Sequence, residues 1–141
     1  MSRRTYRIDL PTFKLLLKYA QEKHAANGEP IPALNKDLDR LESCLNTPFQ
    51  RFGVKPLYRG FLNKASILFY LLNKNHPLLN GNKRMACLCL LYFCYNNGYI
   101  LLLPEAEFEN LAKSVVTANN ENKDQELKRI KEVLKGNLRK V

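Results

Sequence analysis

Two long apolar segments in the middle of the chain constrain its fold more than any other feature. Residues 61–72 and 85–95 carry hydrophobic side chains around nearly the whole circumference of a helix. A helix without a polar face is stable only when it is buried on most sides. The segment between them, residues 73–84, is short and polar. We therefore expect two central helices joined by one short loop, with other helices packed around them.

The N-terminal part of the chain predicts two of those outer helices. Residues 11–26 have apolar side chains at helical spacing, between the start signal Asp9 and the stop signal Gly28. A second helix is expected after Asn35, whose side chain can cap it, and before Pro48, which closes it.

The C-terminal part predicts the remaining helices. Residues 96–98 form a stop signal for the second central helix, and an extended piece is expected over residues 99–103. Two more helices follow, the last ending at Gly136, with the apolar positions Phe108, Leu111, Ala112, Val115, Leu127, Ile130, Val133 and Leu134. The expected fold is all-α, a bundle of about six helices. We expect residues 1–141 to form one domain.

Residues 47–60 do not have a helical pattern. This stretch contains two proline and two glycine residues without a 3.6-residue period. We expect a long connection with exposed aromatic side chains and a small hairpin around Gly53. Loops of this length within a domain are often functional.

Composition limits the partners and the compartment. The chain has 23 Lys and Arg residues against 13 Asp and Glu, so its formal net charge of +10 attracts polyanions without choosing among them. No apolar run approaches the roughly 20 residues that span a bilayer, so no membrane association is expected. The N-terminus does not resemble a signal peptide. The expected location is the cytoplasm.

The four cysteines are expected to be reduced thiols in that compartment. Cys87 and Cys89 would point to different faces of one helix, which does not favour a tetrahedral zinc site. We interpret Cys44, Cys87, Cys89 and Cys94 as small buried hydrophobic residues.

The polar loop between the central helices concentrates chemically useful residues. Pro77 disfavours helical backbone at His76, which would end the preceding helix and project the imidazole. Gly81 permits a tight turn. The next helix starts at about Asn82, and its first N–H groups lack helical acceptors and carry the positive end of the helix dipole.

Two cations occupy that helix start. Lys83 and Arg84 lie where an anion would meet the free N–H groups, and a guanidinium can grip phosphate with two parallel hydrogen bonds. With His76 as a general base nearby, the segment suits a phosphate site. A common Asn-Gly turn followed by solvated cations explains the same residues, and the pattern alone leaves both interpretations open. His24, near the end of the first helix, is expected to have a surface role.

Residues 76–86, His-Pro-Leu-Leu-Asn-Gly-Asn-Lys-Arg-Met-Ala, resemble the signature of the Fic/Doc family, H-x-F-x-[D/E]-G-N-[G/K]-R. The similarity continues at residues 41–43, at residues 64–65 and at residues 97–99. It covers roughly residues 35–135. The resemblance implies the α-helical Fic fold and transfer of part of a nucleotide to a protein hydroxyl.

The resemblance also implies roles for individual residues. His76 would take the proton from the target Ser, Thr or Tyr. The phosphates of ATP, or of another nucleoside triphosphate, would be held by Asn80, Gly81, Asn82, Lys83 and Arg84. A flap that holds the target segment would include Phe52, Gly53, Val54 and Lys55.

Two positions depart from the common family pattern. Asn80 stands where the family has an acidic residue that holds Mg²⁺, and its neutral oxygen would hold the ion less well. Metal-dependent activity is therefore an open question. Leu78 replaces the usual Phe, an apolar exchange at a position expected to anchor the loop in the core.

Two further residues favour the Doc branch of the family. AMP-transferring members carry G-N-G-R-x-x-R, whereas this chain has Lys83 for the second Gly and Cys87 for the second Arg. Both resemble Doc, a toxin that transfers a phosphoryl group. We expect such a kinase, with AMP transfer or a catalytically degenerate binding protein as the alternatives.

That branch implies particular partners. They are a protein substrate, such as a translation factor, and an antitoxin. Residues 117–122 fit the loose inhibitory pattern [S/T]-x-x-x-E-[G/N], but they fall at an expected break between helices, so self-inhibition is not predicted. Nucleic acid is not favoured, because no helix-turn-helix spacing or stacking motif accompanies the charge.

Overall fold

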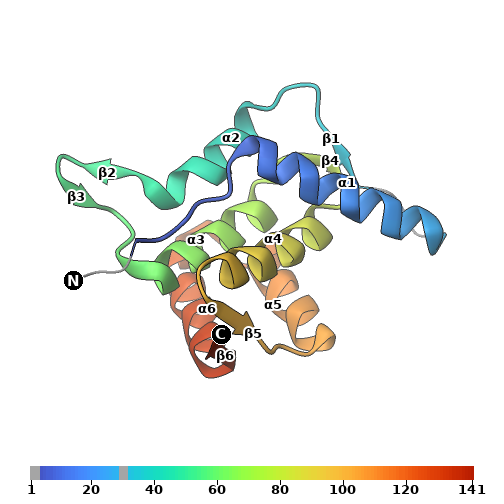
Figure 1. The fold of residues 1–141 in the computed structure, drawn as a ribbon. Helices are drawn as coiled ribbons and strands as arrows, with labels where there is room; N and C mark the ends of the chain where they lie inside the picture. The colour runs from blue at the N-terminus through green and yellow to red at the C-terminus, as the bar shows by residue number, and fades with distance from the viewer. Residues whose placement is uncertain (1–3, 29–31) are drawn as a thin grey trace.

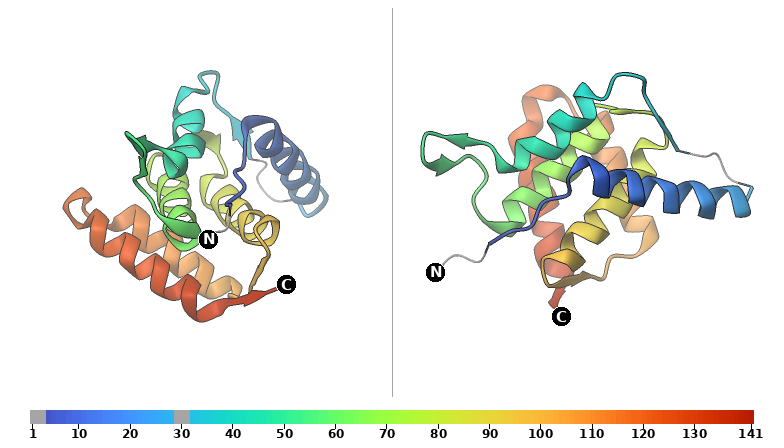
Figure 2. Two further views of the ribbon diagram at one scale, coloured as in Figure 1. Left: turned by 60° about the vertical axis from the view of Figure 1, so that its left-hand side comes forward. Right: turned by 45° about the horizontal axis from the view of Figure 1, so that its top comes forward.

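The computed structural model describes residues 4–28 and 32–141, and these contain six α-helices in three layers (Figures 1 and 2). The middle layer is α3 (Gly60–Lys74) and α4 (Asn82–Asn96). One side is covered by α1 (Leu10–Ala26) and α2 (Asp39–Asn46), and the other by α5 (Glu105–Thr117) and α6 (Lys123–Asn137). The expected all-α fold is confirmed.

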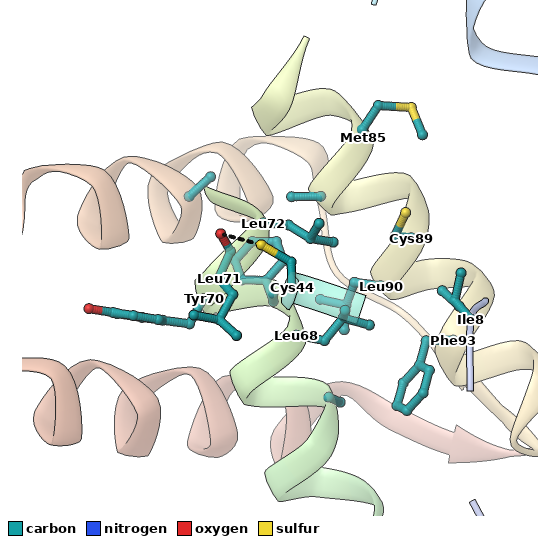
Figure 3. Packing of buried hydrophobic residues seen from close by; sticks show 14 of the residues in the cluster. Ile8, Cys44, Leu68, Tyr70, Leu71, Leu72, Met85, Cys89, Leu90 and Phe93 are labelled. Atoms are coloured by element: carbon teal, nitrogen blue, oxygen red, sulfur yellow. Dashed lines mark hydrogen bonds between the residues drawn. The ribbon is translucent and has the colours of Figure 1, made fainter. Parts of the chain in front are cut away.

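The two central helices are buried to different degrees. Every residue of α3 from Lys64 to Asn73 is buried. Helix α4 contributes Met85, Cys89, Leu90 and Phe93 to the core, some of which Figure 3 shows packed beside α3. Its outer face is open: Leu91 is 39% exposed and Tyr95 is 66% exposed. The expectation of burial all round is therefore wrong for α4, because α1 and α5 flank that face and leave a groove over it.

One predicted helix start is correct and one is wrong. Asp9 caps α1, and its Oδ1 accepts a hydrogen bond of 2.9 Å from the Thr12 N–H. Helix α2 begins later than expected, at Asp39, because Asn35 is not its cap. The Asn35 amide donates instead to the Pro77 carbonyl at 3.0 Å, which fixes it against the loop after α3.

The described residues also form three short antiparallel pairs of strands between or after the helices. Strand β1 (Ala33–Leu34) pairs with β4 (Leu78–Asn80), β2 (Arg51–Phe52) with β3 (Lys55–Pro56), and β5 (Tyr99–Leu101) with β6 (Leu138–Lys140). The predicted hairpin around Gly53 is therefore confirmed, after a 3-10 turn at Thr47–Phe49. Strand β6 was not predicted. Gly136 does not end α6, and the chain turns one residue later to pair with β5.

The break predicted between the last two helices is also present. Helix α5 ends at Thr117, and a 3-10 turn at Asn120–Asn122 precedes α6. Glu121 is exposed in that turn and does not lie on a continuous helix.

Three of the four thiols are buried, and Cys87 is half-buried on the groove face of α4. The Cys44 Sγ donates to the Leu71 carbonyl at 3.6 Å, as Figure 3 shows. Burial raises the pKa of Cys44 to about 11 and that of Cys87 to about 12. The described helices include none that is long and apolar enough to cross a membrane.

Candidate functional site

The loop after α3 projects His76 from the surface. Helix α3 ends at Lys74, and His76 is exposed with φ of 45°, in the left-handed region that few residues other than glycine adopt. Pro77 and Leu78 directly after it are buried. The imidazole therefore stands on a strained backbone position between two anchored segments, an arrangement that is frequent at functional sites.

The Asn82 side chain ties this loop to the start of α4. Its Oδ1 accepts a hydrogen bond of 2.8 Å from the Leu78 N–H, and its Nδ2 donates to the Leu78 carbonyl at 3.1 Å. Arg40 adds a hydrogen bond to the Asn75 carbonyl at 3.2 Å. The Asn82 side chain therefore holds the loop to the start of α4. The expected contact of Asn82 with phosphate stays a prediction.

Gly81 sets the direction in which α4 begins. It is left-handed, with φ of 82°, and α4 has no side-chain cap and no acidic residue in its first turn. A Cβ atom at Gly81 would lie 2.6 Å from the Pro32 Cβ, so only glycine fits between β4 and the chain before β1. The first N–H groups of α4 remain without helical acceptors, which is the property that attracts anions to helix starts.

Lys83 and Arg84 line a groove of about 550 Å³ between α1, α4 and α5. One Arg84 Nη lies 3.4 Å from the His24 Nδ1. The other charged residues that line the groove, among those described, are Lys23, Glu105 and Glu109, and His76 is not one of the described lining residues. The two motif cations therefore face α1 and α5 from the first turn of α4, and the imidazole of His76 lies outside this groove.

His24, for which a surface role rather than a catalytic one was expected, lines the groove beside Arg84. It is half-buried in the groove and contacts a residue of the signature. The sequence carries one signal for this: Lys23 and His24 share the last turn of α1, where cations favour the negative end of the helix dipole. Only the packing of α1 across α4 shows that His24 meets Arg84.

Asn80 is exposed at the end of β4, where it pairs with Ala33 of β1. A neutral amide is a poor sole protein ligand for Mg²⁺, which prefers carboxylates and phosphate oxygens. In the described part of the chain, no three His, Cys, Asp or Glu residues gather into a metal site. The residues present do not make a magnesium site on their own, and the metal role of Asn80 stays a prediction.

The hairpin β2–β3 does not lie beside the motif. Phe52 and Val54 at its tip are 81% and 85% exposed, and Gly53 is in the turn. The hairpin leads into the start of α3, whereas His76 follows its end, and α3 spans 15 residues, about 22 Å at the usual helical rise. Figure 1 shows this separation, with β2 and β3 on the opposite side of the molecule from β4. The strand that borders the signature is β1, and the flap role of the hairpin, with Lys55, stays a prediction.

This fold and this loop define the class of protein. The family model for the Fic/DOC family matches residues 12–94, more than half of the chain. The chain therefore belongs to the Fic/DOC family. Members of this family are usually transferases that use nucleoside triphosphates and act on protein substrates. No curated protein matches the chain.

Proposed function

We propose that this protein transfers the γ-phosphoryl group of ATP, or of another nucleoside triphosphate, to a hydroxyl group of a target protein. In this proposal it belongs to the Doc branch, acts as a toxin on a target such as a translation factor, and is silenced by an antitoxin. Lys83 and Cys87 support that branch, because they occupy positions where AMP-transferring members have Gly and Arg.

One observation carries the proposal: the start of α4 combines N–H groups that have no helical acceptors, two cations and an exposed imidazole in the loop before it. Gly81 is left-handed and offers no side chain to cap these N–H groups. Lys83 and Arg84 add charge in the first turn. A triphosphate would gain hydrogen bonds from the N–H groups and from the guanidinium at once. His76, five residues before Gly81, is then available to the reacting hydroxyl.

The proposed step is an in-line displacement at the γ-phosphorus. The target hydroxyl oxygen forms the new P–O bond while the bond between the γ-phosphorus and the β,γ-bridging oxygen breaks, and ADP leaves. His76 accepts the hydroxyl proton as a general base. The N–H groups of α4 and Arg84 stabilise the negative charge on the transferring group and on ADP. Mg²⁺, when bound to the nucleotide, would neutralise phosphate charge, with Asn80 as a neutral oxygen ligand.

A labelling experiment tests the proposal and separates it from AMP transfer. Purified protein is incubated with cell extract and with ATP labelled at either the γ- or the α-phosphate. We expect a protein band labelled from γ-ATP only, and loss of at least about 100-fold of that label in His76→Ala, because a general base contributes this much or more. The His76 side chain is exposed, so the variant should keep its fold, which circular dichroism checks.

The outcomes separate the rival functions. Label from α-ATP that depends on His76 would identify an AMP transferase. Equal labelling from γ-ATP by wild-type protein and His76→Ala would show that His76 is not the general base.

Asn80 favours a second candidate, a binding protein that has lost catalysis. Its neutral side chain in place of an acid weakens the hold on Mg²⁺. For that protein we expect calorimetry to show ATP binding that is insensitive to Mg²⁺, and no transferred label. Activity that appears only in Asn80→Asp would show that the remainder of the site is competent.

A further inference from the structure

A cavity of about 960 Å³ lies at the opposite end of α3 from His76. Its walls are the N-terminal segment before α1, the 3-10 turn, the hairpin β2–β3 and the first turn of α3. Among the residues that the structure describes, five cations line it: Arg4, Arg7, Arg51, Arg59 and Lys64. The same described lining includes no Asp or Glu. We call it the hairpin-end cavity.

Neutral groups hold several of these cations in place. Arg7 stacks on the Phe49 ring, with its guanidinium carbon 4.6 Å from the ring centre. Arg51 donates to the Val54 carbonyl at 3.3 Å, and Lys64 donates to the Tyr58 carbonyl. These contacts fix the positions of the charges without neutralising them. Each guanidinium keeps further N–H donors for another partner.

The charges repel one another, and the acidic group that interacts with one of them is Asp9, which lies outside the cavity lining and beside Arg7. Lys64 is only 9% exposed, and its burial, together with the nearby charge of Arg51, lowers its pKa. Gly60, in the first turn of α3, also lines the cavity, and that turn carries no acidic residue. The positive end of the helix dipole therefore adds to the five formal charges. A multiply charged anion would remove this repulsion.

We infer that the hairpin-end cavity binds a compact anion that carries several phosphate groups. A single phosphate would leave most of the positive charge uncompensated, whereas a chain of two or three phosphates approaches balance. The volume lies within the range of pockets for small molecules. A concave site encloses such a ligand, whereas a nucleic-acid backbone is normally followed along an open groove. The length of α3, 15 residues, separates this site from the proposed transferase site by about 22 Å.

Calorimetric titration with inorganic tripolyphosphate tests the inference. The test variant is Arg51→Gln/Arg59→Gln, at two exposed positions of the cavity. The matched control is Lys14→Gln/Lys18→Gln, which removes the same charge from the exposed face of α1. A third variant, Lys83→Gln/Arg84→Gln, removes the cations of the proposed nucleotide site. Thermal unfolding verifies that each variant is folded, and Arg59→Gln alone replaces the double variant if that one is not.

We expect tripolyphosphate to bind wild-type protein and the third variant at the hairpin-end cavity with similar affinity. Arg51→Gln/Arg59→Gln should weaken this binding by about tenfold or more, because two charge-assisted contacts are lost. The control pair should change it by less than about twofold, as expected for distant exposed charges screened by salt. This result would hold whether or not the protein transfers phosphate, because the third variant lacks the cations of the transferase site.

Three results would overturn the inference. Equal weakening by the test and control pairs would show an effect of net charge alone. Loss of binding only in Lys83→Gln/Arg84→Gln would place the anion at the start of α4. A single-stranded RNA oligonucleotide that binds more tightly than tripolyphosphate, and depends on Arg51 and Arg59, would identify a nucleic-acid surface.

Discussion

Gly81 decides the shape of the candidate site at the scale of a single residue. Its left-handed backbone begins α4 without a capping side chain, and the space beside its Cα is filled by Pro32. Two independent costs therefore oppose any side chain at this position. A left-handed conformation costs an L-residue about 1–2 kcal/mol, and the contact with Pro32 adds a steric cost.

These two costs can be separated by a matched pair of variants. Gly53, in the hairpin, is also left-handed at φ of 64° but has no heavy atom within 4 Å of the Cβ position. We expect Gly53→Ala to lose about 1 kcal/mol of unfolding free energy and Gly81→Ala to lose about 3 kcal/mol. Urea denaturation measures both. Equal losses of unfolding free energy would show that Pro32 moves aside without an energetic cost.

The sequence indicates which residues are chemically useful, but only the structure shows which of them meet. The positions of His76, Gly81 and the α4 start follow from local signals: a proline, a glycine and an apolar helix. The hydrogen bonds that hold the loop to Asn82 and the contact between His24 and Arg84 depend on backbone geometry and on the packing of α1. No local pattern encodes those distances.

At the scale of elements, periodicity predicts the helices and leaves the short strand pairs largely unseen. Helices α3 and α4 are predicted by the hydrophobic residues that lie around most of their circumference. Strands β1 and β6 have only two or three residues, too few for an alternating pattern. Each exists because a distant partner, β4 or β5, offers it hydrogen bonds. The error at Asn35 has the same origin, since its amide bonds to Pro77 rather than to its own helix.

The thiols of α2 and α4 give a prediction for those elements. Their pKa values are raised by burial, to about 11 for Cys44 and about 12 for Cys94. A raised pKa keeps the thiol protonated and unreactive at neutral pH. The pKa of Cys87 is raised as well, to about 12, so only its partial exposure distinguishes it from the three buried thiols. We expect Ellman's reagent to modify Cys87 slowly in the folded protein, the other three more slowly still, and all four quickly in urea. Cys87→Ser should remove the first of these slow phases, and modification of Cys44 or Cys89 before Cys87 would contradict the packing.

At the scale of the whole molecule, Asn97 joins the N-terminal segment to the end of α4. It is 4% exposed at the end of α4, and it accepts a hydrogen bond of 2.6 Å from the Tyr6 N–H. Its amide donates to the Tyr6 carbonyl at 3.0 Å and to the Phe93 carbonyl at 2.8 Å. The N-terminal segment, which forms one wall of the hairpin-end cavity, is held to α4 by this side chain.

Removal of that link should destabilise the protein. We expect Asn97→Ala to lose about 2–3 kcal/mol, because buried backbone groups lose their partners. Asn137 is the control: its amide donates to the Val133 carbonyl at 2.7 Å, also four residues back, without a second segment. Asn137→Ala should lose about 1 kcal/mol or less. Thermal and urea unfolding compare the two, and a similar loss in both variants would contradict a role of Asn97 in joining the segments.

The placement of the cationic residues is also a property of the whole molecule. The formal net charge is +10. Part of it lines the hairpin-end cavity, and part lies at the start of α4 and in the groove beside it. Composition predicts the excess, whereas only the fold shows that five of the cations line one cavity at the start of α3.

A crystal structure with a non-hydrolysable ATP analogue and Mg²⁺ tests the central claim most directly. We predict that the triphosphate lies at the start of α4, with the Gly81–Lys83 backbone and Arg84 on its oxygens and the γ-phosphate nearest to the His76 imidazole. An α-phosphate nearest to His76 would indicate that the protein transfers AMP rather than a phosphoryl group. A triphosphate bound away from α4, with His76 touching none of it, would contradict the account.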